Sequence, residues 1–350
     1  MRNHRHYFLF LIVLGMLFFL FFGCSNRSSE PAEEPEQEPD ETEETTDTVI
    51  ANYDFVPENI SPISGEDKKE DLWPIMVQLE NTPAARPHSG ISAADLIYEI
   101  EVEYNITRLT TFYQNNIPDK VGNARSTRRQ HIHLWSEWNY LYAFYGGSTY
   151  RPNQNIYDLM EELDIKAPRL DGTFNSSAFY RSGDRKAPHN AYIELSSFKD
   201  QTYKPESVRS FYFDSDTKPF ESPANTVEYA YRSDNKIAYE YDSSDGLYFR
   251  SINGEAMIDA ENGQPLAFDN VIFQKANHYA IEGTPYTNID LVGEGTIHFI
   301  RDGSYTEGTW ERTDFESPTV YYDEKGEKIP FKPGKTFIQI VRNNADITIE

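Results

Sequence analysis

The sequence has little cysteine, and two common sequence signs of catalysis are missing. Cys24 is the single cysteine in 350 residues, so no disulfide can form within the chain. The sequence contains neither the G-x-x-x-x-G-K-[ST] loop that binds nucleotide phosphates nor the G-x-S-x-G turn that carries the serine of α/β-hydrolases. These absences argue against a disulfide-stabilised fold, a P-loop nucleotide hydrolase and an α/β-hydrolase.

Clusters of metal-ligating residues are also scarce. His131 and His133 are two positions apart, a spacing that places the two imidazoles on different faces of a helix. The glycine pair at 146–147, followed by a serine, is too short a signal to indicate phosphate binding. We therefore expect no metal site and no cofactor.

Positively charged residues are the minority. The chain has 32 Lys and Arg against 57 Asp and Glu, and its formal net charge is -25. Without the acidic segment 28–48 (-10) and residues 1–27 (+3), residues 49–350 still carry -18. Nucleic-acid binding depends on cations that neutralise phosphates, so we expect no nucleic-acid partner.

Long apolar runs are confined to the start of the chain. Residues 7–22 form an apolar run of 16 residues, short of the roughly 20 that a membrane-spanning helix needs. Arg2 and Arg5 precede this run and Gly23-Cys24 follows it, which is the arrangement of an export signal. We therefore predict a lipoprotein signal peptide over residues 1–24, with lipid attached to Cys24 and the protein held on the extracytoplasmic face of the cell membrane. The alternative is an ordinary signal peptide with an incidental cysteine.

A polar segment follows the predicted signal peptide. Residues 28–48 contain ten acidic residues and no aromatic residue. Such a composition cannot bury enough apolar surface to offset the entropy lost on ordering. Residues 25–52 are therefore predicted to be a disordered acidic tether.

Residues 53–200 have the pattern of a mixed α/β domain. Residues 72–79 and 106–113 are predicted strands, and residues 96–103 alternate apolar with mostly acidic residues. This alternation predicts a half-buried strand whose acidic row faces solvent. Ile132, Trp135 and Trp138 recur at the spacing of a helix with one buried stripe.

Residues 207–342 are strand-like and rich in turn signals. Asp245-Gly246, Asn253-Gly254 and Asp302-Gly303 are typical hairpin turns. This half is predicted to be β-rich, with its polar residues at the surface and in turns. The whole chain is thus expected to have an α+β fold, with layered mixed sheets, helices on one side and a β-rich C-terminal segment.

Cations collect in two stretches of this acidic chain. Loops concentrate functional groups, and Arg and His suit anion binding and proton transfer respectively. The candidate ligand-binding residues are Arg86, Ser89, Arg108, Arg125, Ser126, Arg128, Lys186, His189 and Asn190. The alternative for the arginines is ion pairing with Asp95, Glu99, Glu101 and Glu103, and the alternative for residues 186–190 is hydrogen bonding within a loop.

Several strings resemble the DUF3048 family of YerB-like bacterial lipoproteins. They include N-T-P-A-A-R-P-H-S-G-I-S-A-A-D-L-I-Y-E, N-I-T-R-L, R-K-A-P-H-N-A-Y and, in the second half, Y-F-R-S-I-N-G and I-D-L-V-G-E-G. The likeness covers roughly residues 55–342. It implies two family segments and layered sheets with helices on one side, and it implies no particular activity.

Three classes of function are compatible with the sequence. The first is a surface module that binds an envelope component, either a glycan or an anionic group, or a partner protein. The second is an envelope hydrolase or lyase that uses Glu99 or Glu101 as acid or base together with His189. The third is a structural or assembly lipoprotein without a small-molecule site. Whether the chain is an enzyme is left open by the sequence.

The lipid anchor leads to the first prediction. Replacing Cys24 with Ala should release the protein from the membrane fraction, because the attachment atom is lost. Cell fractionation measures this directly, with Cys24→Ala compared against the unchanged chain. Full retention of the variant in membranes would contradict lipid anchoring.

Overall fold

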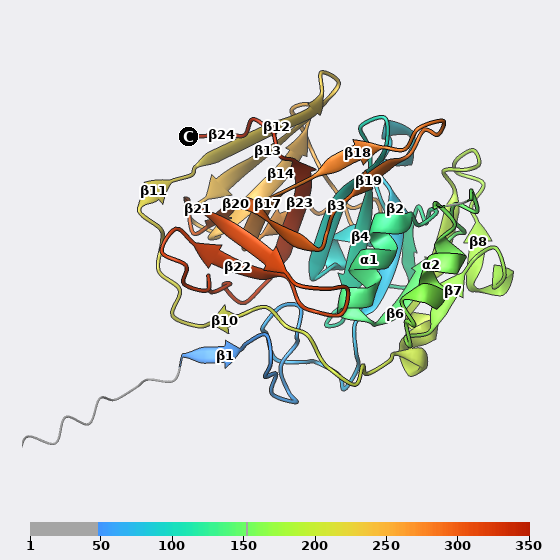
Figure 1. The fold of residues 1–350 in the computed structure, drawn as a ribbon, viewed down its shortest axis with the longest axis horizontal. Helices are drawn as coiled ribbons and strands as arrows, with labels where there is room; N and C mark the ends of the chain where they lie inside the picture. Colours follow the sequence, from blue (N-terminus) through green and yellow to red (C-terminus); the bar gives the residue numbers. More distant parts are fainter. Residues whose placement is uncertain (1–47, 152) are drawn as a thin grey trace, which may run out of the picture. The chain divides into compact units, whose positions relative to one another are not determined.

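The computed structural model describes residues 48–151 and 153–350 (Figure 1). The predicted signal peptide with Cys24, and residues 25–47 of the predicted tether, lie outside these ranges. Residues 49–51 form strand β1 (Val49–Ala51), which pairs with β10 (Phe213–Asp214), and Ala51 is fully buried. Regular structure thus begins before residue 53, the predicted boundary. No helix in the described ranges is both long and apolar enough to cross a membrane.

One sheet of 11 strands dominates the described chain. Its edge strand β22 pairs only with β21, and the other neighbours follow a single path. In spatial order the strands are β11 (Ser222–Pro223), β21 (Ser304–Arg312), β20 (Gly293–Arg301), β17 (Asn270–Ala276), β23 (Thr336–Arg342), β3 (Leu96–Glu103), β4 (Ile106–Tyr113), β2 (Ile75–Glu80), β6 (Leu141–Phe144) and β7 (Arg169–Asp171), with β22 (Val320–Asp323) beside β21.

The two predicted domains share this sheet. Strand β23 comes from the second half of the chain and pairs in parallel with β3 of the first half, with Phe337 opposite Ile97 and Gln339 opposite Glu99. Hydrogen bonds therefore run without a break from strands of the first half to strands of the second (Figure 1).

A second sheet of six strands is built from the C-terminal half. It consists of β15 (Glu255–Ala256), β14 (Leu247–Ile252), β13 (Asn235–Asp242), β12 (Thr226–Arg232) and β24 (Thr348–Ile349), with β16 (Ala267–Phe268) beside β14. Two smaller sheets complete the strands: β5 (Lys120–Gly122), β9 (Ala191–Glu194) and β8 (Phe179–Arg181) form one, and β18 (His278–Ala280) and β19 (Thr287–Ile289) form the other.

Helices are few among the described residues. The two α-helices are α1 (Arg129–Trp138) and α2 (Ile156–Glu162), and the 3-10 helices are η1 (Pro83–Ala85), η2 (Ile91–Ala93), η3 (Ser176–Ala178) and η4 (Leu195–Gln201). The described chain is β-rich, as was predicted for its C-terminal segment, and its strands are spread over several sheets. The finer assignment to a layered α+β class stays a prediction.

Both faces of the 11-stranded sheet are covered. Ile97 of β3 belongs to an apolar cluster that includes Tyr239 of the six-stranded sheet. The next residue, Tyr98, belongs to a second cluster with Trp135 and Trp138 of α1. Successive residues of a strand point to opposite faces. The six-stranded sheet therefore packs on one face, and α1 on the other, where Figure 1 shows it lying over β4 and β2.

This double covering corrects the prediction that the acidic row of β3 faces solvent. Glu99 and Glu101 are buried, because their face of the strand is covered by the six-stranded sheet. The alternation of residues 96–103 identifies two chemically different faces, but both faces are internal. On the polar face, Glu99 pairs with Arg250 of the six-stranded sheet, and Glu101 pairs with Arg342 of the neighbouring strand β23.

The first of these ion pairs joins Glu99 to Arg250 of β14. Nη2 of Arg250 lies 2.6 Å from Oε2 of Glu99, and both side chains are 0% exposed. The other carboxylate oxygen accepts hydrogen bonds from Asn81 and Thr107, while Nε of Arg250 donates to the hydroxyl of Tyr239. A buried ion pair needs such additional hydrogen bonds, because desolvation of the charges costs several kcal/mol.

Breaking this pair should destabilise the protein. Arg250→Met leaves the carboxylate of Glu99 buried without its cation, so we expect the free energy of unfolding to fall by about 3–5 kcal/mol. Urea unfolding measures the change. The double variant Glu99→Leu/Arg250→Met should recover most of the loss, since no unpaired charge remains.

The matched control is Arg151→Met, which removes an exposed arginine paired with Asp158. Its free energy of unfolding should stay within about 0.5 kcal/mol of the unchanged protein. Equal stability of Arg250→Met and this control would show that the buried pair does not hold the sheets together.

Candidate anion-binding site

The site is organised around the loop that follows β2. Strand β2 ends at Glu80, and alternation along the strand directs Glu80 toward the α1 face and Asn81 toward the six-stranded sheet. Within the loop, the imidazole Nε2 of His88 donates to the backbone carbonyl of Glu80, and Nε and Nη2 of Arg86 donate to the carbonyl of Asn81 at 3.1 and 2.9 Å. These bonds fold the loop back onto the end of its own strand.

The carboxylate of Glu80 gathers side chains from three other segments. Nδ1 of His189 donates to its Oε2 at 2.9 Å, and the hydroxyl of Thr82 donates to its Oε1 at 3.0 Å. Nε of Arg125 lies 3.4 Å from Oε2. Glu80 is nearly buried, whereas the side chains of His189 and Arg125 are 27% and 30% exposed. A buried carboxylate thus holds two cation-forming side chains at the surface.

Hydrogen bonds to the backbone position His189. Its carbonyl accepts from the side-chain amide of Asn123, which also donates to the hydroxyl of Tyr192. Arg185, four residues earlier, donates from Nη1 and Nη2 to the carbonyls of Ala84 and Pro87. The loop that carries His189 is therefore fastened to the loop that follows Glu80.

Two more predicted residues belong to the same segment. Asn190 accepts from Arg181 through its side-chain oxygen and donates to the carbonyl of Ser182, so it stabilises the loop internally. Lys186 is exposed. The contacts of Asn190 are those of the alternative given in the sequence analysis, hydrogen bonding within the loop.

Arg108 and Arg128 form ion pairs with a second carboxylate, that of Glu103. Nη2 of Arg108 is 3.5 Å from Oε2 of Glu103, and Arg128 donates to Oε1 of Glu103 from Nε at 2.7 Å and from Nη2. A register shift after Glu101 turns Glu103 toward the face that carries α1, where these arginines lie. The backbone carbonyl of Ser126 accepts from Nη1 of Arg108 at 2.6 Å.

The two carboxylates belong to one contiguous cluster. Glu80 and Arg108 are directly opposed in the pairing of β2 with β4, so their side chains share a face of the sheet. Burial, followed by repulsion from Arg128, lowers the pKa of Arg108 to about 9, and the attraction of Glu103 offsets part of this. Arg108, Arg125 and Arg128 outnumber the two carboxylates they contact.

Three predicted residues lie apart from this cluster. Glu99 is sealed in its pair with Arg250, and Glu101 accepts from Arg342 at 2.6 Å and from Thr287 at 3.0 Å. Ser89 donates to Glu261 at 2.6 Å. Glu99 and Glu101 therefore form ion pairs, as in the alternative given in the sequence analysis. Their partners are arginines of the second half of the chain and not the expected arginines of the first half.

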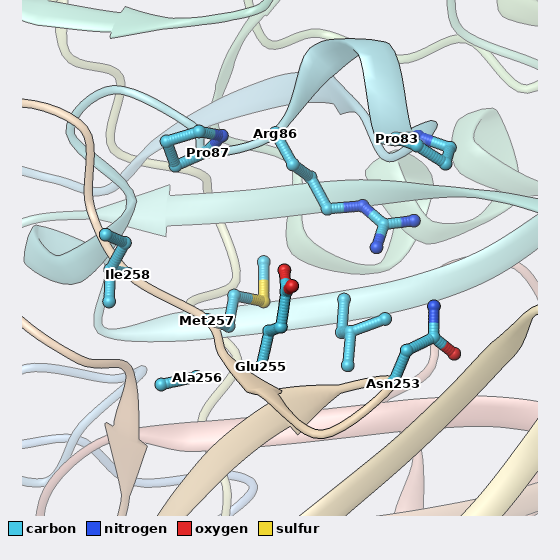
Figure 2. A pocket seen from close by; sticks show the side chains of 9 residues that line it. Pro83, Arg86, Pro87, Asn253, Glu255, Ala256, Met257 and Ile258 are labelled. Carbon is cyan, nitrogen blue, oxygen red and sulfur yellow. The ribbon is translucent and has the colours of Figure 1, made fainter.

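Arg86 also lies apart, in a cavity of about 410 Å³ on the other side of the loop. Figure 2 shows its guanidinium directed into the space between the 83–87 loop and the hairpin at residues 252–258, with the carboxylate of Glu255 rising from that hairpin. Arg86 and His189 thus lie on separate surfaces and do not form one site.

The buried histidines do not resemble metal ligands. No group of three or more His, Cys, Asp or Glu side chains with metal-binding geometry occurs in the ranges that the structure covers. Burial lowers the pKa of His88 to about 4 and that of His133 to about 3, and it holds the pKa of His131 well below its usual range. Nδ1 of His131 accepts from the backbone N–H of Arg128 at the start of α1, a structural role.

Sequence reasoning missed Glu80 and Arg250. Glu80 stands one residue past the predicted strand 72–79 and directly before the marked loop, and its place at that junction is the signal that was available. Arg250 lies on the same buried face of β14 as Tyr248 and Ile252. A single arginine in an apolar row is a sign of a buried charge that requires a partner.

Neutral histidines make stability depend on pH. In the unfolded chain a histidine protonates near pH 6.5, whereas folded His133 stays neutral to about pH 3. Its contribution is therefore present above pH 6.5 and is lost as the pH falls below it. Burial raises the pKa of Asp95 to about 6, which acts in the opposite direction between about pH 6 and 3.8.

His133→Gln tests this balance. The fall in unfolding free energy between pH 7 and pH 5 should be smaller in the variant by about 2 kcal/mol, because Gln has no titrating nitrogen. Urea unfolding at both pH values measures the difference. An unchanged pH dependence would show that His133 is not held neutral in the folded state.

Comparison with known proteins identifies the family. The model described as "Protein of unknown function (DUF3048) N-terminal domain" matches residues 62–208, and the corresponding C-terminal domain model matches residues 226–338. "Putative lipoprotein YerB" of Bacillus subtilis (strain 168) is 30% identical over 295 residues, covering 80% of this chain and 86% of that protein. The crystal structure of YerB protein from Bacillus subtilis aligns with a TM-score of 0.69 at 27% identity, covering 83% of this chain and 99% of the other. The chain therefore belongs to the DUF3048 family and is similar to a lipoprotein.

Proposed function

We propose that this protein is anchored to the extracytoplasmic face of the cell membrane through Cys24 and binds an anionic group of an envelope component at the Glu80 cluster. The observation that carries the proposal is the state of Arg125. Its side chain is 30% exposed, lies 3.4 Å from Glu80, and donates no hydrogen bond within the described residues. The planar fork of a guanidinium is suited to carboxylate and phosphate groups.

The surroundings of Arg125 support an anionic ligand. His189 lies beside Arg125 with its Nδ1 used by Glu80, and its Nε2 donates to an anion only when the ring carries a second proton. Arg185 makes its contacts to carbonyl and amide oxygens, with no carboxylate within 4 Å in the described ranges. Excess positive charge at this place contrasts with the charge of -18 on residues 49–350. An envelope polymer with carboxylate or phosphate groups fits this local charge.

Acid–base catalysis is the second candidate, and the geometry of Glu80 and His189 favours it. A carboxylate that accepts from Nδ1 fixes the tautomer in which Nε2 is the basic nitrogen. Glu80 would then replace Glu99 and Glu101 as the acidic residue of an envelope hydrolase or lyase. The third candidate, a structural or assembly role, rests on four ion pairs that link the two halves of the described chain: Lys120–Glu261, Arg250–Glu99, Arg312–Glu137 and Arg342–Glu101.

Arg125→Gln, His189→Gln and the double variant test the binding function. Removing one charge-assisted contact should weaken binding by roughly 1.5–3 kcal/mol without unfolding the protein, since both side chains are partly exposed. Binding of inorganic phosphate, acetate and isolated cell-wall fragments to the full-length protein is measured by calorimetry. Arg151→Gln, an exposed arginine paired with Asp158, is the matched control.

Three outcomes separate the candidates. Undiminished binding by a stably folded double variant would refute the site. A large loss of stability in either single variant would favour the structural role. Turnover of wall fragments that is lost with His189→Gln while binding persists would favour the enzyme.

A further inference from the structure

The cavity that contains Arg86 is a second, independent place for a ligand. It lies between the 83–87 loop of the first half and the hairpin at residues 252–258 of the second half (Figure 2). Its volume of about 410 Å³ is in the range of small-molecule sites. The proposed anion site at Glu80 lies on the other face of the sheet, so the two sites are separable by mutation.

Arg86 supplies the cavity with a cation that no carboxylate neutralises. Two of its donors are used by the carbonyl of Asn81, and no carboxylate lies within 4 Å of its guanidinium in the described part of the chain. Glu255 lines the same cavity beyond that distance. Burial lowers the pKa of Arg86. A half-buried guanidinium with unused donors is suited to a ligand carboxylate, which it binds through two parallel hydrogen bonds.

Apart from Arg86, Asn253 and Glu255, the residues that line the cavity are apolar. Pro83 and Pro87 line it from the loop, and Ile252, Met257 and Ile258 line it from the hairpin. Met257 is held in place because its sulfur accepts from Nη1 of the buried Arg250 at 3.0 Å. A ligand that fills this space therefore carries an apolar group next to its negative charge, which distinguishes it from inorganic phosphate or a simple sugar.

A smaller cavity of about 140 Å³ shares Pro83 and Arg86 with the first and has polar walls. Asn81 lines it, is 3% exposed, and has a side-chain oxygen without a hydrogen-bond partner among the described residues. Its amide nitrogen donates to Glu99 and Thr107, which fixes the oxygen's position. Asn235, which lines the same cavity, has a second unpaired side-chain oxygen. Two free acceptors beside a free guanidinium match a ligand that has N–H groups as well as a carboxylate.

We propose that these joined cavities bind the C-terminal end of a peptide whose last residue is apolar. The terminal carboxylate lies on Arg86, the last side chain packs between the two prolines and Met257, and backbone N–H groups of the peptide donate to Asn81 and Asn235. The combination of anion, apolar group and N–H donors within a few atoms is characteristic of a peptide terminus. It differs from the ligand proposed for the Glu80 cluster and does not depend on it.

The probe is N-acetyl-Ala-Leu with a free carboxylate, compared with the same peptide as its C-terminal amide. Calorimetry with the full-length protein in detergent should detect the acid, and the amide should bind on the order of 10- to 100-fold more weakly, because only the acid pairs with Arg86. Arg86→Gln should reduce binding of the acid to the level of the amide. Arg151→Gln, at an exposed arginine outside both sites, should leave it unchanged.

Ile258→Asp provides a test that leaves Arg86 in place. Ile258 is partly exposed, so the fold should tolerate the change, while a carboxylate in the apolar wall should repel the peptide terminus. Equal affinity for acid and amide, or unchanged binding by a folded Arg86→Gln or Ile258→Asp variant, would overturn the proposal. Absence of binding by the unchanged protein at millimolar peptide would overturn it as well.

Discussion

The buried pair of Glu99 and Arg250 is the interaction on which the site geometry depends. Two fully buried charges are stable only when every remaining donor and acceptor finds a partner. Asn81, Thr107 and Tyr239 fill that role around the pair. The same requirement fixes the amide of Asn81 at the start of the 81–90 loop. The hydrogen-bonding needs of an ion pair buried between two sheets thereby help to position a surface loop.

The loop in turn separates two chemically different surfaces. Alternation at the end of β2 sends Glu80 to one face and Asn81 to the other, and this one-residue difference decides which cations gather where. His189 and Arg125 contact the carboxylate of Glu80, whereas Arg86 contacts the backbone carbonyl of Asn81. Because β2 lies between β4 and β6 inside the sheet, both surfaces are supported by rigid strands, which favours precise positioning of ligands.

The sequence predicts local structure here better than it predicts partners. Alternation over residues 96–103 correctly indicates a strand, and the spacing of Ile132, Trp135 and Trp138 correctly indicates the buried stripe of α1. The prediction that the acidic row of residues 96–103 faces solvent was wrong. Alternation with a period of two shows that the two faces of a strand differ, but it does not show what covers each face. Arg250 and Arg342, the cations that cover Glu99 and Glu101, are 151 and 241 positions away in the chain, and no local pattern encodes such a distance. Glu80 was missed for the same reason, since only the fold brings His189 to it.

Charge balance distinguishes structural arginines from candidate ligand-binding ones. Carboxylates outnumber cations in residues 49–350, so a partner for any arginine is easily supplied, and Arg250, Arg312 and Arg342 each have one. Arg86 and Arg185 make their contacts to carbonyl and amide oxygens, and Arg125 makes no side-chain hydrogen bond within the described ranges. An unneutralised arginine costs stability wherever it is partly buried, because desolvation of the charge is not repaid. Arg86 and Arg185 have no carboxylate within 4 Å in the described ranges, and Arg125 shares the carboxylate of Glu80 with His189. In a chain with this excess of acid, such arginines around one loop are better explained by ligands that carry the missing negative charge than by a shortage of carboxylates.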